Sequence, residues 1–259
     1  MATDLPAGVD LFLAPNPGPM TLDGTNTWRI TSHDAPGAPA VVIDPGPDDE
    51  PHLRQVAAAG PVGLIVVTHR HRDHTAGAAR LAELTGAPVR GADPVECVDG
   101  PPLADGERLV DRLQVVLTPG HTTDSVCLRL LDSAGATVAV FTGDTILGRG
   151  TTVIAHPDGA LGPYLDSLRR LADIGAVPVL PGHGPVRPNL AAVCAEYLTH
   201  RTQRLDQVRA VLQEIGPTAT VAQVTDVVYD FLDPDDATLR GAAERSVAAQ
   251  LDHLRGAPS

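Results

Sequence analysis

The sequence predicts an α/β protein in which sheets are covered by helices. Runs rich in Val, Leu, Ile and Thr, bounded by Gly, Pro or Asp, have the composition of short strands. Helical patterns stand between several of these runs, and such alternation is typical of sheets with helices packed on their faces. The expected strands are residues 9–14, 26–31, 40–44, 62–68, 108–117, 125–131, 136–142 and 177–180, and the expected helices are 48–59, 74–85 and 161–174.

The chain changes character near residue 188, where the strand patterns stop. From there on, apolar residues recur at helical spacing. The expected helices of this tail run from Leu190 to Ile215, near 218–232 and over 235–255, with Asp233-Pro234-Asp235 as the turn and cap between the last two. We therefore predict two domains, residues 1–188 and residues 189–259, of which the second is all-helical.

Composition and charge narrow the range of functions. The 259 residues are 43% hydrophobic, which is enough for one large domain and a small one. The formal net charge of −13 argues against binding polyanions through the overall field of the protein. The three cysteines are scattered and lack CxxC spacing, so we expect neither a disulfide framework nor a thiolate zinc site.

The sequence carries no signal for a membrane. No stretch reaches the roughly 18 consecutive apolar residues that a transmembrane helix needs. The N-terminal residues lack the basic start and apolar run of a signal peptide. We therefore expect a cytoplasmic protein without a membrane partner.

Residues 66–77, VVTHRHRDHTAG, bring together His69, His71, Asp73 and His74. A strand pattern precedes these side chains and a helical pattern follows them, so they lie on a strand-to-helix loop, where ligand sites of open α/β sheets gather. Imidazole and carboxylate groups at this spacing can converge on zinc. The alternative is a solvated polar turn, but so many ligand side chains close together favour a metal site.

Three later strand patterns end in a similar way. His121 and His183 each follow a strand pattern and a Pro-Gly turn, and Asp144 follows a strand pattern and a glycine. Each of these residues alone is compatible with an ordinary turn. Their recurrence at strand ends favours one site assembled at a common edge of the sheets.

At these residues the sequence resembles the metallo-β-lactamase-fold hydrolases. The likeness rests on His69-x-His71-x-Asp73-His74 followed by His121, Asp144 and His183. Within the superfamily the chain is most similar to the beta-lactamase-like protein 2 branch, through NPGPMTLDGTNT (16–27), ILGRGTTV (146–153), PGHGPV (181–186) and YLTHR (197–201). The resemblance implies an αββα four-layer metallo-β-lactamase sandwich and a small C-terminal all-helical, winged-helix-like domain.

The resemblance also assigns roles to the candidate site residues. It implies two Zn²⁺ ions held by seven side chains: His69, His71 and His121 on one ion, Asp73, His74 and His183 on the other, and Asp144 between them. A metal-bound hydroxide would attack the substrate, with Asp73 as the catalytic residue that orients it and accepts a proton. Asp44 resembles the family's aspartate that supports the histidine loop. Other divalent metals such as Mn²⁺ or Fe²⁺ can occupy His/Asp sites of this kind.

The zinc β-lactamases of this fold lack a bridging aspartate, so the resemblance of Asp144 to a bridging ligand implies phosphodiester or thioester hydrolysis, with at most weak β-lactamase side activity. Members of the branch that the chain resembles cleave single-stranded RNA, and an Arg-bearing helix start near residue 201 can contact phosphates. We therefore predict an endoribonuclease-like hydrolase. The alternative is a thioester or ester hydrolase of the glyoxalase II type, which suits an acidic chain without an aromatic platform for stacked bases.

Four residues are predicted to bind substrate: Asn26, Thr152, His200 and Arg201. The expected partner is accordingly single-stranded RNA or a small ester or thioester. Metal content would separate these functions from that of a mononuclear iron oxygenase of the same fold. A binding module without activity is disfavoured because every metal ligand is present. The sequence leaves the oligomeric state open, with a homodimer among the options.

Overall fold

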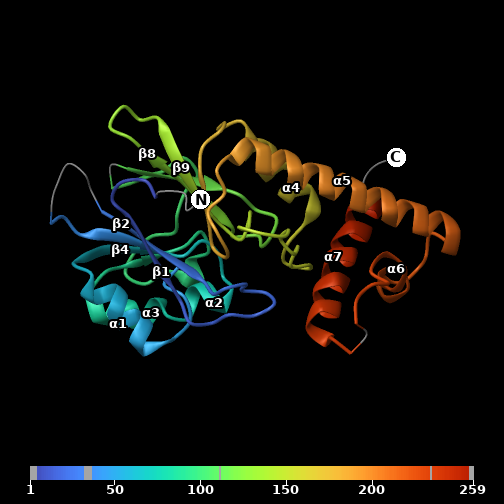
Figure 1. Cartoon of the computed structure of the whole chain (residues 1–259), viewed down its shortest axis with the longest axis horizontal. Coiled ribbons are helices and arrows are strands. Elements are labelled where there is room, and N and C mark those ends of the chain that lie inside the picture. The colour runs from blue at the N-terminus through green and yellow to red at the C-terminus, as the bar shows by residue number, and fades with distance from the viewer. Residues whose placement is uncertain (1–4, 32–36, 111, 234, 257–259) are drawn as a thin grey trace.

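The computed structural model describes residues 5–31, 37–110, 112–233 and 235–256. Two five-stranded sheets pack face to face, and helices cover the outer face of each sheet (Figure 1). The α/β fold and the helical tail predicted from the sequence are thereby confirmed. Pro234, part of the predicted turn and cap, lies outside the described residues.

The first sheet is built from the N-terminal third of the chain. Its order is β1(Val9–Leu13), β2(Asn26–Ile30), β3(Ala40–Ile43), β4(Val62–Val66) and β5(Val89–Arg90). Strands β1 to β3 pair antiparallel, whereas β3, β4 and β5 run parallel. The outer face packs against α1(Glu50–Ala58) and α3(Ala78–Thr85), and the short elements α2(Arg72–Thr75) and η1(Pro94–Glu96) lie in the adjoining loops.

The second sheet follows in the chain. Its order is β10(Val179–Pro181), β9(Thr137–Gly143), β8(Val126–Leu131), β7(Leu113–Leu117) and β6(Arg108–Leu109). Strands β9 and β10 are parallel, and β8 is antiparallel to both β7 and β9. Strands β7, β9 and β10 therefore point in one direction. Helices α4(Leu161–Ala172) and α5(Leu190–Ile215) cover the outer face.

The main core lies between the two sheets. Along β8 the side chains alternate: Leu128 and Leu130 face the first sheet, whereas Cys127 faces the outer helices. This period of two is the geometry of a strand that is buried on both faces. Trp28 of β2 meets Phe141 of β9 edge to face, with ring centroids 5.8 Å apart. The sheets are therefore locked together close to the strand ends that carry the candidate ligands.

The tail consists of α5, α6(Val221–Val228) and α7(Ala237–Gly256). The first part of α5 packs with α4 in the outer core, through residues such as Tyr197. Its second part forms a separate small core with α6 and α7, through Val208, Val224 and Val247. Helix α5 thus serves both predicted domains, and the boundary at residue 188 stays a prediction. Within its described residues the tail contains helices and no strand.

Two predicted elements differ from the observed ones. The expected strand 108–117 is a hairpin of β6 and β7, with Val110 at φ 33° beside the turn. The sequence between these two strands contains neither Gly nor Pro, so composition does not indicate a turn there. The expected helix 74–85 is divided into α2 and α3, which meet near Gly77. A Cβ at Gly77 would lie 2.8 Å from both Leu53 Cδ2 and Pro47 O, so only glycine allows this approach.

Across the described ranges, none of the helices combines the length and the hydropathy needed to span a lipid bilayer.

Truncation of the central strand tests the importance of the core between the sheets. Leu128→Ala should lower the free energy of unfolding by about 2–5 kcal/mol, because Leu128 is fully buried and its loss leaves a cavity. The measurement is urea denaturation of the metal-free protein. The matched control is Leu13→Ala on the edge strand β1, where the side chain is half exposed and the loss should stay under about 1 kcal/mol. Equal losses would contradict this account.

Candidate metal centre

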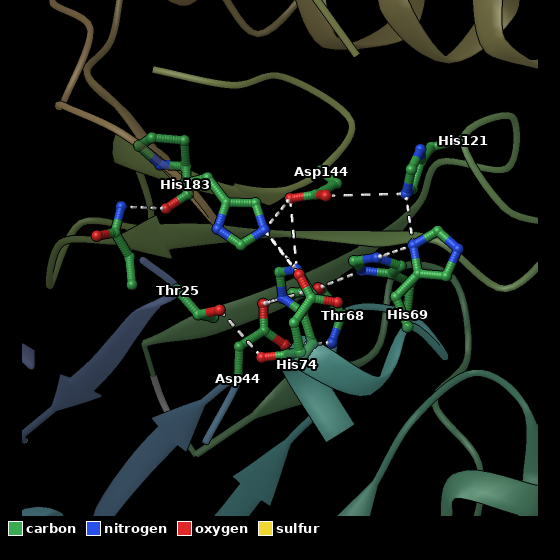
Figure 2. A network of polar contacts seen from close by, with 12 residues as sticks. Thr25, Asp44, Thr68, His69, His74, His121, Asp144 and His183 are labelled. Carbon is green, nitrogen blue, oxygen red and sulfur yellow. Dashed lines mark hydrogen bonds and ion pairs between the residues drawn. The ribbon is translucent and has the colours of Figure 1, made fainter. Parts of the chain in front are cut away.

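The candidate ligands lie just beyond the C-terminal ends of strands that run in common directions. In the first sheet, Asp44 follows β3 and His69 follows β4. In the second sheet, His121, Asp144 and His183 follow β7, β9 and β10. Because parallel strands end at one edge of their sheet, residues far apart in the sequence meet there. Figure 2 shows these side chains converging from both sheets.

The structure brings all seven predicted ligands into two adjacent groups. The three-histidine group contains His69, His71, His121 and Asp144, and the second group contains Asp73, His74 and His183. Within each group, one ligand atom per residue lies within 4.8 Å of the others. The grouping corresponds to the division inferred from the sequence resemblance.

The three-histidine group turns its ring nitrogens toward one point. His71 Nδ1 lies 3.0 Å from both His69 Nε2 and His121 Nε2. Asp144 Oδ2 lies 3.8 Å from His121 Nε2. Neutral imidazoles facing one another at this distance are a donor set that suits a divalent metal.

The second group combines two histidines and a carboxylate. His183 Nε2 lies 3.2 Å from His74 Nε2 and 3.1 Å from Asp73 Oδ2. Asp144 Oδ1 faces this group, at 3.5 Å from His74 Nε2 and 3.6 Å from His183 Nε2. The two oxygens of Asp144 therefore face different groups, which is the arrangement that a bridging carboxylate requires.

Asp44 supports ligands of both groups. Its Oδ1 accepts from the Thr68 backbone N–H at 2.7 Å, and its Oδ2 accepts from the Thr68 hydroxyl at 2.8 Å. His69 Nδ1 lies 3.1 Å from the same hydroxyl, and His74 Nδ1 lies 2.8 Å from Asp44 Oδ2. Because both Nδ1 atoms are directed at acceptors, both Nε2 atoms are left to face the ligand cluster.

Backbone carbonyls orient His121 and His183. His121 Nδ1 lies 2.6 Å from the carbonyl of Val153, and His183 Nδ1 lies 3.0 Å from the carbonyl of Gly24. In each ring Nδ1 faces a carbonyl acceptor, which turns Nε2 toward the ligand cluster. Thr25 donates its hydroxyl to the Asp73 carbonyl at 3.0 Å, which ties the loop before β2 to the ligand loop.

Two glycines allow the ligands to pack this closely. A Cβ at Gly182 would lie 2.8 Å from both Asp144 Oδ1 and His74 Cε1. A Cβ at Gly143 would lie 2.5 Å from the Thr68 hydroxyl, and Gly143 also has φ 47°. Any other residue at either position would push a ligand or its support out of place.

The two groups differ in their electrostatics. In the three-histidine group, burial lowers the pKa of His121 to about 4 and holds the pKa of His69 well below its ordinary value. In the second group, burial alone would lower the pKa of His74, but the carboxylates of Asp44 and Asp144 outweigh it and raise that pKa well above its ordinary value. Burial opposes ionisation of Asp144, yet His183 and His74 hold its pKa well below the usual range.

These residues fit a divalent metal. Asp144 Oδ1 is buried and has no hydrogen-bond partner among the described residues, although the carboxylate is held ionised. A buried carboxylate oxygen without a hydrogen bond is costly, and a cation between the two groups would remove that cost. The donors are imidazole nitrogens and carboxylate oxygens, the ligands that zinc, iron and manganese accept.

The predicted substrate residues are placed differently from one another. Thr152, His200 and Arg201 line one pocket of about 200 Å³ between the tail and the ligand loops. Asn26 lies elsewhere: its side-chain amide donates to the carbonyls of Pro181 and Gly184 and so supports the His183 turn. A direct contact between Asn26 and substrate stays a prediction.

The pocket is separated from the ligands by two residues. The Thr152 hydroxyl donates to the Asp144 carbonyl at 2.5 Å, and the next residue supplies the Val153 carbonyl that engages His121. Arg201 donates to the Thr152 carbonyl. The pocket and the ligand cluster thus share one wall.

Arg204 belongs to the Arg-bearing helix start that the sequence singles out, whereas two further pocket residues, Tyr229 and Phe231, escape the sequence analysis. Arg204 lies over the ring of Tyr229, 4.6 Å from its centroid, and the Tyr229 and Phe231 centroids are 5.9 Å apart. Phe231 is 70% exposed, which is unusual for a phenylalanine. No local motif marks these residues, because they come together only when α6 and α7 fold back on α5.

The family model described as the Metallo-beta-lactamase superfamily matches residues 20–183. The chain belongs to this superfamily. The predicted resemblance is therefore confirmed. The predicted class of enzyme is confirmed too: the protein is a metal-dependent hydrolase.

Two relatives and one solved structure show what this chain is similar to. A beta-lactamase-like protein 2 homolog of Caenorhabditis elegans is 33% identical over 245 residues, covering 85% of this chain and 76% of the relative. An atrochrysone carboxyl ACP thioesterase of Aspergillus fumigatus is 31% identical over 247 residues, covering 87% of this chain and 74% of the relative. A beta-lactamase domain protein from Burkholderia ambifaria has the same fold, with a TM-score of 0.80, 20% identity and coverage of 98% and 88%.

Neutralising Asp44 tests its support of both ligand groups. Asp44→Asn keeps the size of the side chain but removes the charge that His74 and Thr68 face, so the affinity for Zn²⁺ should fall roughly 10–100-fold. The measurement is competition with a chromophoric chelator. Asp10→Asn is the matched control, because the exposed carboxylate of Asp10 on β1 pairs with Arg29 on β2 and not with a metal ligand. Unchanged zinc affinity in Asp44→Asn would contradict the assignment.

Proposed function

We propose that this protein hydrolyses the acyl thioester or ester bond of a small substrate, with two divalent metal ions, Zn²⁺ foremost, at the two ligand groups. The observation that carries the proposal is the charge around the ligand loop. Arg70 lies between His69 and His71, and its guanidinium is met by the carboxylates of Asp93, Asp124 and Asp158. A polyanion approaching this side of the site would meet more negative than positive charge.

Further charges near the site point the same way. Burial together with Asp124 and Asp93 raises the pKa of Glu96, a sign of crowded carboxylates. Arg149 is paired with Asp23 at 2.6 Å. The net charge of the chain, −13, adds to this field. A neutral or singly charged acyl substrate is therefore favoured over an RNA strand.

Bound at these ligands, divalent ions would act as Lewis acids and supply a nucleophile from water near neutral pH. The chain itself supplies the proton acceptor. Asp73 has the most exposed side chain of the three site carboxylates, at 29% against 12% for Asp144 and 1% for Asp44. Burial raises the pKa of Asp73, but the hydrogen bond with His183 and the charges of His74 and His183 together outweigh burial and lower that pKa, so the carboxylate stays ionised. Asp73 can therefore accept the proton of the attacking water and return it to the leaving group.

The pocket beside Thr152 is the proposed site for the remainder of the substrate. Phe231 and Tyr229 offer apolar surface, while His200 and Arg204 offer hydrogen-bond donors. The Nδ1 atom of His200 and the Nε atom of Arg201 are buried without a partner among the described residues. Such a pocket suits an acyl group or carrier with one polar or anionic end. The thioesterase relative makes an acyl thioester the first substrate to test.

Loss of Asp73 tests the proposed proton transfer. Asp73→Ala should lower the turnover of an acyl thioester by roughly 100-fold or more, because proton transfer by a positioned group is lost along with a ligand. The assay uses metal-quantified protein with an acyl thioester and a single-stranded RNA side by side. Asp166→Ala, an exposed aspartate of α4, is the control and should keep full activity. Thioester turnover that survives Asp73→Ala would contradict the proposal.

Single-stranded RNA is the second candidate substrate, and one observation favours it. Arg204, Tyr229 and Phe231 place a guanidinium and two aromatic rings in one pocket, a combination that binds phosphates and stacks bases. RNA cleavage that disappears in Asp73→Ala, without thioester turnover, would assign this function instead.

Substitution of Arg204 tests whether the pocket binds substrate. Arg204→Gln should raise KM about tenfold with little change in kcat, because it removes a binding contact away from the reacting atoms. Steady-state kinetics with the substrate that is turned over measures both values. Arg209→Gln on the same helix is the control, since Arg209 pairs with Asp206 at the surface. A loss confined to kcat would argue against a binding role.

A further inference from the structure

Arg70 occupies the position between two metal ligands, yet its guanidinium points to carboxylates from three separate segments. Nε contacts Asp124 at 3.1 Å, Nη2 contacts Asp93 at 3.0 Å and Nη1 contacts Asp158 at 3.2 Å. Asp93 caps η1, Asp124 lies in the loop after β7, and Asp158 lies in the segment before α4. One cation therefore joins three loops to the ligand loop.

Two of these loops hold the third histidine of the group. Asp124 is three residues after His121 in the same loop. The segment of Asp158 contacts that loop from the other side: Ala155 N–H donates to the His121 carbonyl at 3.0 Å, and Ala160 N–H donates to the Gly120 carbonyl at 2.9 Å. The His121 backbone is thus enclosed between two segments that both contact Arg70.

Thr123 connects these segments directly. Its hydroxyl donates to Asp158 at 2.8 Å and accepts from Arg70 Nη2 at 3.2 Å. Arg70, Thr123 and Asp158 therefore form a closed ring of contacts. Asp124 has a side chain only 5% exposed, so this carboxylate depends on the guanidinium for its charge balance.

The second ligand group is held by different contacts. His74 is supported by Asp44, and His183 by the carbonyl of Gly24. Asp73 is tied by its backbone to Thr25. A change at Arg70 would therefore disturb one ligand group and leave the supports of the other in place.

We propose that Arg70 is a positioning residue that sets His121 against His69 and His71, and so governs metal affinity at the three-histidine group alone. The planar guanidinium of an arginine can donate hydrogen bonds to several carboxylates in fixed directions. A neutral side chain of similar length cannot do so. This role rests on the two-metal part of the proposed function and not on the substrate, so it can hold or fail whether or not the protein is a thioesterase.

The test is a Co²⁺ titration of metal-free, full-length protein, followed by visible absorption and by metal quantification after dialysis. Wild-type protein should bind two ions. Arg70→Gln should keep one ion at wild-type affinity and weaken the other by about tenfold or more. His121→Ala is the reference: the spectrum of the ion retained by Arg70→Gln should match the spectrum of the ion retained by His121→Ala.

The matched control is Arg80→Gln. Arg80 also contacts two carboxylates, Glu50 and Glu83, and its side chain is 35% exposed against 36% for Arg70. It lies on α3 and contacts no ligand loop, so both ions should bind as in wild type. Equal weakening of both ions in Arg70→Gln, no weakening of either, or a single class of site in wild-type protein would overturn the proposal.

A second variant keeps the proposal testable if Arg70→Gln does not fold. Asp158→Asn removes one of the three carboxylates and preserves the size of the side chain. It should weaken the same ion, by less than Arg70→Gln. Asp105→Asn, which weakens an exposed pair with Arg170, is its control. Arg70→Lys should restore part of the affinity because it returns the positive charge. Weakening of the other ion by Asp158→Asn would overturn the selectivity claimed for Arg70.

Discussion

The buried carboxylate of Asp44 is the interaction on which the metal centre depends. It accepts from the backbone and hydroxyl of Thr68 and faces Nδ1 of His74, so one side chain sets ligands in both groups. Asp44 has φ 51°, an uncommon conformation that directs its side chain from the end of β3 across to the end of β4. Because β3 and β4 are parallel neighbours, their C-terminal ends lie close together. The Asp44 side chain can therefore contact the ligand loop that follows β4.

Charged side chains lie both among the metal ligands and in the loops around them. The ligands themselves are buried or partly buried and mix neutral imidazoles with ionised carboxylates. Beyond them, Arg70 meets Asp93, Asp124 and Asp158, and those pairs join loops and not ligands. The outer pairs are partly exposed and contribute little stability each, yet together they hold three loops in one geometry. Their effect is better described as alignment of His121 than as stabilisation of the fold.

Sequence patterns predict the parts of this site that are local. The ligands of the His-x-His-x-Asp-His loop and the later strand-end residues follow from spacing, because each stands at the end of its own strand. The divided segment 108–117 could not be predicted, since its turn carries no Gly or Pro. The partners of Arg70 could not be predicted either, because Asp93, Asp124 and Asp158 are brought together only by tertiary packing.

The metal ligands and the neighbouring pocket are built by different parts of the fold. The ligand cluster is built by strand ends, which the two packed sheets hold rigidly. The neighbouring pocket is built by α5, α6 and α7, whose small core involves Val208, Val224 and Val247. Thr152 and Val153 line the pocket, and both are bonded to ligand residues. Under the proposed function, a group seated in the pocket would lie beside the wall that also supports the ligands. Changes in the tail helices can consequently alter which substrate is bound without disturbing the metal ligands.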